Sequence, residues 1–135
     1  MDSVKFEAVS PIFTVDDLPR ALDFYQRVLG FGLAWAWGTP PEIAAVCRDK
    51  VEITLTQRAD AKPVGASQVY LVITGIDTYY ASLQQLGVTI VVPIDDRIYG
   101  MRDFRIADPS GNELSIGEVI AGSRDHDGGA VGANE

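Results

Sequence analysis

The sequence predicts an α+β protein built from two copies of a module that has one strand, one helix and three further strands. This order occurs twice along the 135-residue chain. Leu-Gly ends both predicted helices, at 29–30 and 86–87, so the copies are offset by 57 residues. With 47% hydrophobic residues, the chain can form one compact core or two small modules that share a sheet. Because such a module is too small to be stable alone, we interpret the pattern as an internal duplication.

The first module is predicted over residues 4–58. Strand-forming residues occupy 5–15, after which Asp16 or Asp17 can cap a helix with Pro19 in its first turn. Apolar residues recur at helical spacing until Gly30 ends the helix. Three further strands are predicted at 31–38, 43–48 and 51–57, the last two joined by a turn at Asp49-Lys50.

The second module is predicted over residues 67–120, after a linker at 59–66 that contains Pro, Gly and Ala. Asp77 can cap its helix, and Gly87 ends it. Its strands are predicted at 68–74, 88–94, 101–108 and 112–120, the last two joined by the turn Asp108-Pro109-Ser110-Gly111. The domain therefore covers 1–121. The tail at 122–135 has no periodicity and is expected to be disordered.

Charge and composition narrow the possible partners. A net charge of −8 repels phosphate backbones, so we expect no nucleic-acid partner; the same charge either attracts a cationic ligand weakly or only keeps the protein dispersed. No apolar run has the length of a signal peptide or a membrane span, so we expect no membrane association and a cytoplasmic location. Cys47 is the only cysteine, which excludes an intrachain disulfide and fits a small core residue.

Strand alternation separates two faces in each predicted sheet. One face is apolar and suits the helix of its module. The other face is mixed, with polar and aromatic side chains; its residues include Ser10, Glu52, Thr54, Gln68, Tyr70, Glu113 and Ser115. A mixed face either is exposed to water or lines a cavity, and the pattern alone leaves both open.

Two segments resemble a known superfamily. VDDLPRALDFYQRVLGF at 15–31 and MRDFRIADPSGNELSIGE at 101–118 resemble the glyoxalase, bleomycin-resistance and extradiol-dioxygenase proteins, also called vicinal oxygen chelate. The likeness covers about 5–119. It implies that the βαβββ modules form a curled mixed sheet around a cavity or groove, and that the protein is a homodimer.

The resemblance also implies where a divalent metal would bind. The four metal positions fall at Ser10, Thr54, Gln68 and Ser115, whose hydroxyls and amide are poor ligands for transition metals. The only histidine, His126, lies in the tail. We therefore expect no metal and no other cofactor, as in the bleomycin-resistance branch. Glu52 and Glu113 either could hold a hard cation or could attract a cationic group of a ligand.

Aromatic and adaptable side chains complete the predicted ligand-binding set. Trp35 and Trp37 alternate on one strand, so both indoles can contact a planar ligand or pack in a core or dimer interface. Tyr70 shares the mixed face with Gln68. Tyr99, Met101, Arg102 and Phe104 surround a turn at Gly100 and could line the mouth of a cavity, although Arg102 and Asp103 could also be a charge pair in water.

These observations favour a metal-free small-molecule binding protein that sequesters an aromatic or peptide-like antibiotic or natural product. No catalytic residue is predicted, because no histidine is available for a Ser-His-Asp or Cys-His arrangement. The alternative is a superfamily enzyme of lyase, isomerase or dioxygenase type, with Glu52, Tyr70 or Glu113 as acid or base, or with a bound metal. A third possibility is a subunit that delivers a metabolite to a partner enzyme.

Overall fold

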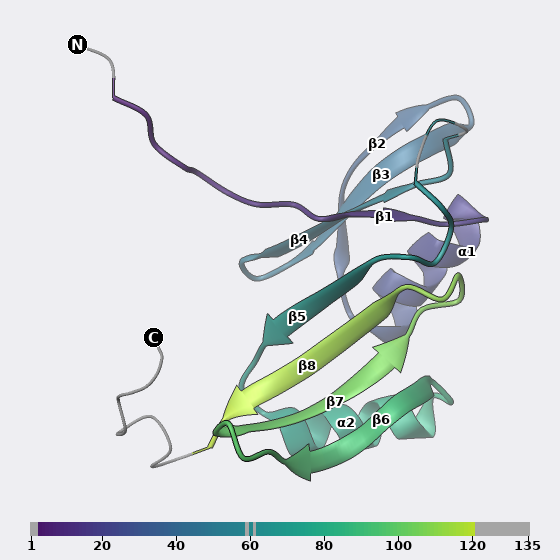
Figure 1. The fold of residues 1–135 in the computed structure, drawn as a ribbon. Helices are drawn as coiled ribbons and strands as arrows, with labels where there is room; N and C mark the ends of the chain where they lie inside the picture. The colour runs from purple at the N-terminus through teal and green to yellow at the C-terminus, as the bar shows by residue number, and fades with distance from the viewer. Residues whose placement is uncertain (1–2, 59, 61, 121–135) are drawn as a thin grey trace. The chain divides into compact units, whose positions relative to one another are not determined.

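The computed structural model describes residues 3–58, 60 and 62–120. The chain divides into two compact units, Met1–Ser67 and Gln68–Glu135, and each contains a four-stranded mixed sheet with helical segments (Figure 1). The predicted α+β class is confirmed. The predicted tail at 122–135, with His126, lies outside the described residues. No helix in the described part of the chain is long and apolar enough to cross a membrane.

In the first unit, β1 is the parallel partner of β4, and the other strand pairs are antiparallel. The strand order is β1-β4-β3-β2. The elements are β1 (Ile12–Thr14), α1 (Leu18–Asp23), the π-helix η1 (Phe24–Val28), β2 (Gly32–Gly38), β3 (Pro41–Arg48) and β4 (Val51–Thr56). The predicted turn at Asp49-Lys50 joins β3 to β4, because Arg48 pairs with Val51.

The second unit repeats this arrangement. Its sheet order is β5-β8-β7-β6, with β5 parallel to β8 and the other pairs antiparallel. The elements are β5 (Gln68–Val72), α2 (Ile76–Gln85), β6 (Thr89–Asp96), β7 (Met101–Ala107) and β8 (Glu113–Val119). The same strand order and directions in both units confirm the repeated module of one strand, one helix and three strands.

The first helix follows its predicted capping signals. The Asp17 carboxylate accepts a 3.1 Å hydrogen bond from the Arg20 backbone N–H, and Gly30 adopts a left-handed φ of 81° after the helix. The sequence pattern did not predict the change to π-helical bonding at η1. Tyr25, in η1, is fully buried, and its ring packs edge-on against Phe31, so it belongs to the core.

The second helix corrects a prediction. Gly75, with a left-handed φ of 83°, is the N-cap residue, and Asp77 lies within the first turn. The Asp77 carboxylate accepts a 2.9 Å hydrogen bond from Arg102, while the Glu118 side chain of β8 accepts the backbone N–H of Ile76 at 3.0 Å. A side chain of the sheet therefore accepts a backbone N–H from the first turn of α2. Local sequence does not reveal such a distant partner.

The first strand is also shorter than predicted. Regular pairing is limited to Ile12–Thr14, and residues 3–11 have no helix or strand assignment. Val4, Phe6 and Val9 in this segment are 83–96% exposed. The Val, Ile and Phe content over 5–15 favours a strand, but among residues 3–58, 60 and 62–120 no strand pairs with residues 5–11.

The helix-facing sides of both sheets form the two cores, as alternation predicted. Phe13, Ile53 and Leu55 are fully buried in the first unit, where α1 packs on β3 and β4. In the second unit, α2 packs on β7 and β8, and Phe104, Ile106, Leu114 and Ile116 are 0–1% exposed. The intervening side chains therefore define a second, mixed face on each sheet.

Candidate functional site

The mixed face of the first unit carries both tryptophans. Strand register places Ile12, Thr54, Ala45 and Trp35 in one row across β1, β4, β3 and β2. The next row contains Thr14, Thr56, Ile43 and Trp37. Trp35 is 43% exposed and Trp37 is 66% exposed. The two indoles thus lie on the same sheet face as Thr54, and neither is a core residue of the chain.

Two positions of the expected metal set contact each other in this unit. The hydroxyl oxygens of Ser10 and Thr54 are 2.8 Å apart, within hydrogen-bond distance. The backbone N–H of Thr54 donates to the Pro11 carbonyl at 2.9 Å, which fixes the first strand against β4. One of the two hydroxyls therefore donates to the other.

Glu52 borders an open pocket of about 360 Å³ beside the β3–β4 turn. The lining residues are Glu7, Ala8, Val9, Cys47, Asp49, Lys50, Val51 and Glu52. Three carboxylates and one ammonium give this pocket an acidic lining without an aromatic ring. Within 3–58, 60 and 62–120, no three His, Cys, Asp or Glu side chains are grouped so that they could hold a metal ion.

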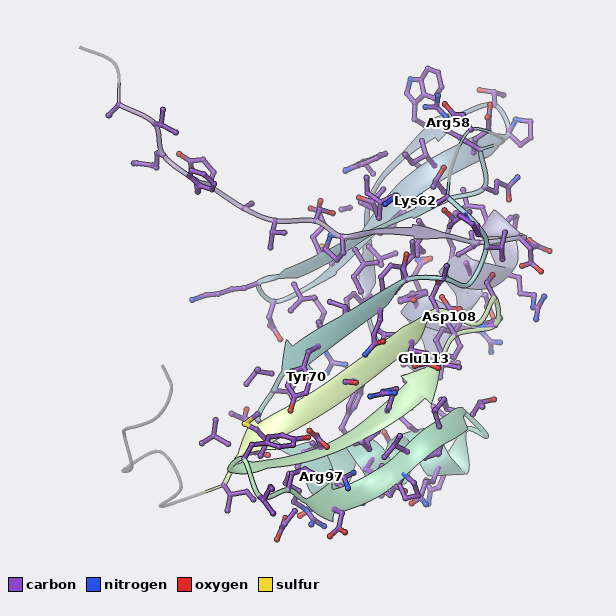
Figure 2. The ribbon with its side chains drawn as sticks, viewed as in Figure 1. Arg58, Lys62, Tyr70, Arg97, Asp108 and Glu113 are labelled. Carbon is purple, nitrogen blue, oxygen red and sulfur yellow. The ribbon has the colours of Figure 1, made fainter. Side chains whose placement is uncertain are left out.

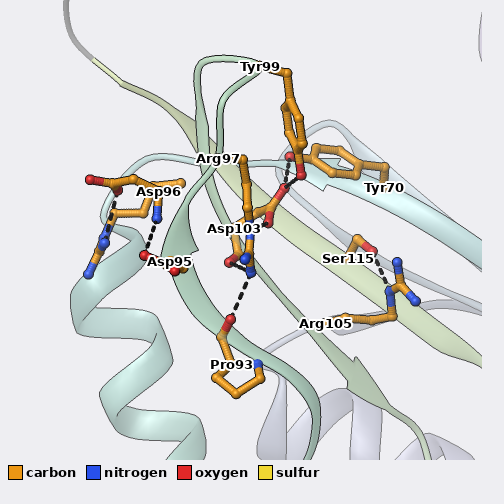
Figure 3. Close-up of polar contacts among 10 residues, drawn as sticks. Tyr70, Pro93, Asp95, Asp96, Arg97, Tyr99, Asp103, Arg105 and Ser115 are labelled. Carbon is orange, nitrogen blue, oxygen red and sulfur yellow. Dashed lines mark hydrogen bonds and ion pairs between the residues drawn. The ribbon is translucent and has the colours of Figure 1, made fainter.

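The mixed face of the second unit contains a row of three polar residues. Tyr70 of β5 pairs with Ser115 of β8, which pairs with Arg105 of β7. The Arg105 Nε–H donates to the Ser115 hydroxyl at 3.1 Å (Figure 3). Its Nη1 lies 3.4 Å from a carboxylate oxygen of Glu113, one row away, and Gln68 is the strand partner of Glu113. Figure 2 shows Tyr70 and Glu113 along this sheet.

Asp103 is the centre of a hydrogen-bond network on the same face. Its carboxylate accepts from the hydroxyl of Tyr70 at 2.8 Å, from the hydroxyl of Tyr99 at 2.6 Å and from Arg97 Nε at 2.7 Å (Figure 3). Arg97 also donates to the backbone carbonyls of Asp103 and Pro93, at 3.0 and 2.8 Å. The Asp103 side chain is 9% exposed. Both phenol rings are therefore oriented through one nearly buried carboxylate.

The network determines the protonation states of its members. Burial and the hydrogen bond to Asp103 raise the pKa of Tyr70, and the same two causes raise the pKa of Tyr99. Burial opposes ionisation of Asp103, but hydrogen bonds from Tyr99, Arg97 and Tyr70 outweigh it and lower the pKa of Asp103. At neutral pH, two neutral phenols and one guanidinium therefore donate to an ionised carboxylate.

Gly117 makes the Tyr70 position possible. It lies in β8 between Val72 and Asp103, and it has no side chain where the Tyr70 ring crosses the sheet. A Cβ atom at this position would lie 2.2 Å from the Tyr70 hydroxyl oxygen and 3.2 Å from the Asp103 Cβ. A glycine is therefore required for this close approach.

The residues predicted around Gly100 separate onto two faces. Tyr99 is 63% exposed and belongs to the Asp103 network, while Met101 is half-buried and shares the strand parity of Asp103. Phe104 lies on the helix side, where its ring centroid is 4.8 Å from that of Tyr80 and its side chain is 1% exposed. Phe104 is therefore a core residue, which corrects its predicted place at the mouth of a cavity.

Arg102 also lies on the helix side of β7. It donates to Asp77 at 2.9 Å and to Asp96 at 3.0 Å. The alternative pairing of Arg102 with Asp103 is wrong, because neighbouring strand residues point to opposite faces. We therefore remove Arg102 and Phe104 from the candidate site.

Sequence reasoning missed Arg97, Arg105 and Gly117, and it did not assign Asp103 to the site. Alternation along 101–107 was the available signal, since Asp103 and Arg105 have the parity opposite to the apolar Phe104 and Ile106. No comparable pattern marks Arg97, which reaches Asp103 from the start of the β6–β7 connection.

The side chains present do not fit the metal expected from the resemblance. Ser10 and Thr54 are bonded to each other, and Ser115 accepts from the guanidinium of Arg105. A divalent cation at Ser115 would be repelled by this positive charge, and Gln68 adds only a neutral amide. These positions therefore differ from a metal site in the chemistry of their side chains, which are hydroxyls and an amide with a guanidinium beside them.

The fold and these faces define a class: an α+β protein of repeated βαβββ modules, with aromatic and hydrogen-bonding side chains on its open sheet faces. The model of the Glyoxalase/Bleomycin resistance protein/Dioxygenase superfamily matches residues 8–116. The chain belongs to this superfamily. An uncharacterized protein of Mycobacterium bovis is 25% identical over 127 residues, with 84% of each chain covered.

Solved structures of other proteins share the fold. TnmS3, an antibiotic binding protein from Streptomyces sp. CB03234, superposes with a TM-score of 0.71 at 23% identity, covering 86% of this chain and 99% of its own. The bleomycin-binding protein of Streptomyces verticillus, complexed with copper(II)-bleomycin, gives 0.70 at 20%, covering 84% and 97%. A lactoylglutathione lyase of Agrobacterium tumefaciens gives 0.69 at 21%, covering 82% and 92%. Both binding proteins and an enzyme therefore have this fold.

Proposed function

We propose that this protein binds and sequesters an aromatic or peptide-like antibiotic or natural product without a metal and without changing it chemically. One observation carries the proposal. Exposed rings occupy the same strand faces as the expected metal positions, and those positions hold side chains that do not suit a metal. Trp35 and Trp37 accompany Thr54, and Tyr70 pairs with Ser115.

Ring contact supplies a plausible binding energy. Covering about 100 Å² of a ring is worth about 2.5 kcal/mol, while micromolar affinity requires about 8 kcal/mol after association costs. One ring is therefore insufficient, and a ligand must contact several. Each unit offers two such rings, Trp35 and Trp37 in the first and Tyr70 and Tyr99 in the second, and each ring is 43–66% exposed.

The chemistry of the network supports binding over catalysis. A general base needs a pKa near the working pH and a free lone pair directed at the substrate. Asp103 has a lowered pKa and accepts three side-chain hydrogen bonds, while Tyr70 and Tyr99 have raised pKa values and stay protonated. These groups hold ring positions well and transfer protons poorly.

The antibiotic-binding structures support the same ligand class. Their names describe one protein that binds bleomycin and one that binds an antibiotic, each on this fold. We extend this class of ligand to the present chain as part of the proposal. The proposal also includes a homodimer. Val4, Phe6 and Val9 in residues 3–11 are exposed, and a second copy of the chain could cover them. Light scattering should give about twice the 14.6 kDa chain mass.

A ligand screen tests the proposed function. Purified protein is titrated with aromatic and peptide antibiotics while tryptophan emission is recorded, and each bound compound is then recovered and weighed by mass spectrometry. We expect saturable quenching and unchanged ligand mass. A compound that is converted, with stoichiometric zinc, iron, nickel or manganese in the active protein, would contradict sequestration and favour the enzyme alternative.

A further inference from the structure

The second unit places a guanidinium beside one of the expected metal positions. Arg105 lies on the mixed face of the β5-β8-β7-β6 sheet, in one row with Ser115 and Tyr70. Its Nε is 3.1 Å from the Ser115 hydroxyl (Figure 3). A fixed positive charge therefore lies beside Ser115, a position where the resemblance implied a metal ligand.

Arg105 has more N–H donors than its protein partners accept. A guanidinium has five N–H donors. One of them reaches Ser115 and one approaches Glu113 at 3.4 Å, longer than the roughly 2.8 Å of a strong charge-assisted bond. The other three have no protein acceptor among residues 3–58, 60 and 62–120. The Arg105 side chain is 37% exposed, so a ligand can reach these donors.

The neighbouring arginines differ in this respect. Arg97 is bonded to the Asp103 carboxylate and to two backbone carbonyls. Arg102, three positions before Arg105 on the same strand, is paired with two carboxylates on the opposite face. Of these three arginines, Arg105 has the longest contact with a carboxylate, and its strand position is in the same row as Tyr70.

We propose that Arg105 recognises a carboxylate on the ligand, and that the ligand is an aromatic acid whose ring contacts Tyr70. The proposal rests on the proposed function and names its ligand class. A planar guanidinium matches a carboxylate with two parallel N–H···O bonds, and Tyr70 is its neighbour but one across β8.

Nearby charges favour a singly charged acid. The net charge of −8 acts at long range, but salt screens it over about 8–10 Å, so contact with Arg105 dominates once a ligand is bound. Glu113 lies within 3.4 Å of the guanidinium and repels a phosphate dianion more strongly than a carboxylate. A ligand carboxylate competes with Glu113 for the same donors.

A pair of matched probes tests the charge preference. 2-Naphthoate and 2-naphthamide have the same ring system and differ in charge, and their Kd values are measured by NMR titration of the full chain. We expect the acid to bind at least about tenfold more tightly than the amide. Arg105→Gln should weaken acid binding about tenfold and leave amide binding unchanged, whereas Glu113→Gln should strengthen acid binding severalfold.

Arg102→Gln is the matched control, because it removes the same charge from the same strand on the opposite face. It should leave the ratio of acid to amide affinity unchanged, and thermal unfolding of each variant confirms that it is folded. Equal binding of the two probes, a similar loss in Arg102→Gln, or no binding of either probe at millimolar concentration would overturn the role of Arg105. The proposed function fails separately, if the wider antibiotic screen finds no ligand or finds turnover.

Discussion

The hydroxyl of Tyr70 in β5 donates a 2.8 Å hydrogen bond to the carboxylate of Asp103 in β7, across the intervening strand β8. The contact passes over Gly117, the one residue of that row without a side chain. Tyr99 donates to the same carboxylate oxygen at 2.6 Å. Strand register, a glycine and a nearly buried carboxylate together hold two exposed rings in place.

Gly117→Ala should displace the Tyr70 ring. The new methyl group would overlap the Tyr70 hydroxyl, which is the movable end of a side chain, so the ring shifts and the bond to Asp103 is lost. We expect a loss of about 1 kcal/mol in the free energy of unfolding, measured by urea denaturation. In a Tyr70→Ala background the same substitution should cost only a few tenths of a kcal/mol. Equal costs in both backgrounds would show that the overlap is not with Tyr70.

Asp103→Asn should reduce stability in a pH-dependent way. The lowered pKa of Asp103 means that its ionised form stabilises the folded state above the ordinary value of 3.8, and that this contribution is lost as the pH falls through the folded-state pKa. We expect the variant to be about 2 kcal/mol less stable than the original protein at pH 7. The difference should shrink as the pH falls below 3.8 and through the lowered folded-state pKa of Asp103. A difference that is constant with pH would contradict the ionised network.

Tyr70→Phe separates the hydroxyl from the ring. The raised pKa of Tyr70 stabilises the folded protein below the ordinary value of 10.0, and this contribution declines as the pH rises above it, because the unfolded state ionises first. The variant should lose about 1 kcal/mol at pH 7 and should lack this part of the alkaline decline. Ligand affinity should change less than about threefold, whereas Tyr70→Ala should reduce it about tenfold. Titration calorimetry and urea denaturation provide both measurements.

The tryptophans should contribute more to binding than to folding. Trp37 is 66% exposed, so we expect Trp37→Ala to change the free energy of unfolding by less than about 0.5 kcal/mol. Its effect on ligand affinity should be larger, since a ring that a ligand covers is lost. Because the chain has only two tryptophans, the fluorescence of each single variant comes from the tryptophan that remains. A large loss of stability with unchanged affinity would assign Trp37 to a structural role.

Sequence patterns predicted most of the fold because each module follows local rules. Asp17 and Gly30 mark the ends of the first helical segment, and alternation in β4, β7 and β8 separates the core face from the mixed face. The errors arose where a distant residue decides the structure. Glu118 in β8 accepts the hydrogen bond from the first backbone N–H of α2, at Ile76, and the first strand pairs only over Ile12–Thr14.

The candidate site was harder to predict, because its organisation depends on contacts between strands. Tyr70 could be placed on the mixed face by parity alone. Its partner Asp103 is 33 positions away, and Gly117 matters only because a ring crosses it. Arg102 was predicted to lie in the site because it is near Gly100. In β7, however, Arg105 lies on the mixed face and Arg102 lies on the helix side.

In the proposed function, the protein holds its ligand by ring contact, without a metal and without reaction. The most direct measurement uses protein dialysed against EDTA, a ligand identified in the screen, and mass spectrometry of that ligand after prolonged incubation. We predict the same Kd with and without EDTA treatment and complete recovery of the intact ligand. Loss of binding on metal removal that added metal restores, or a new product mass that accumulates with time, would contradict the claim.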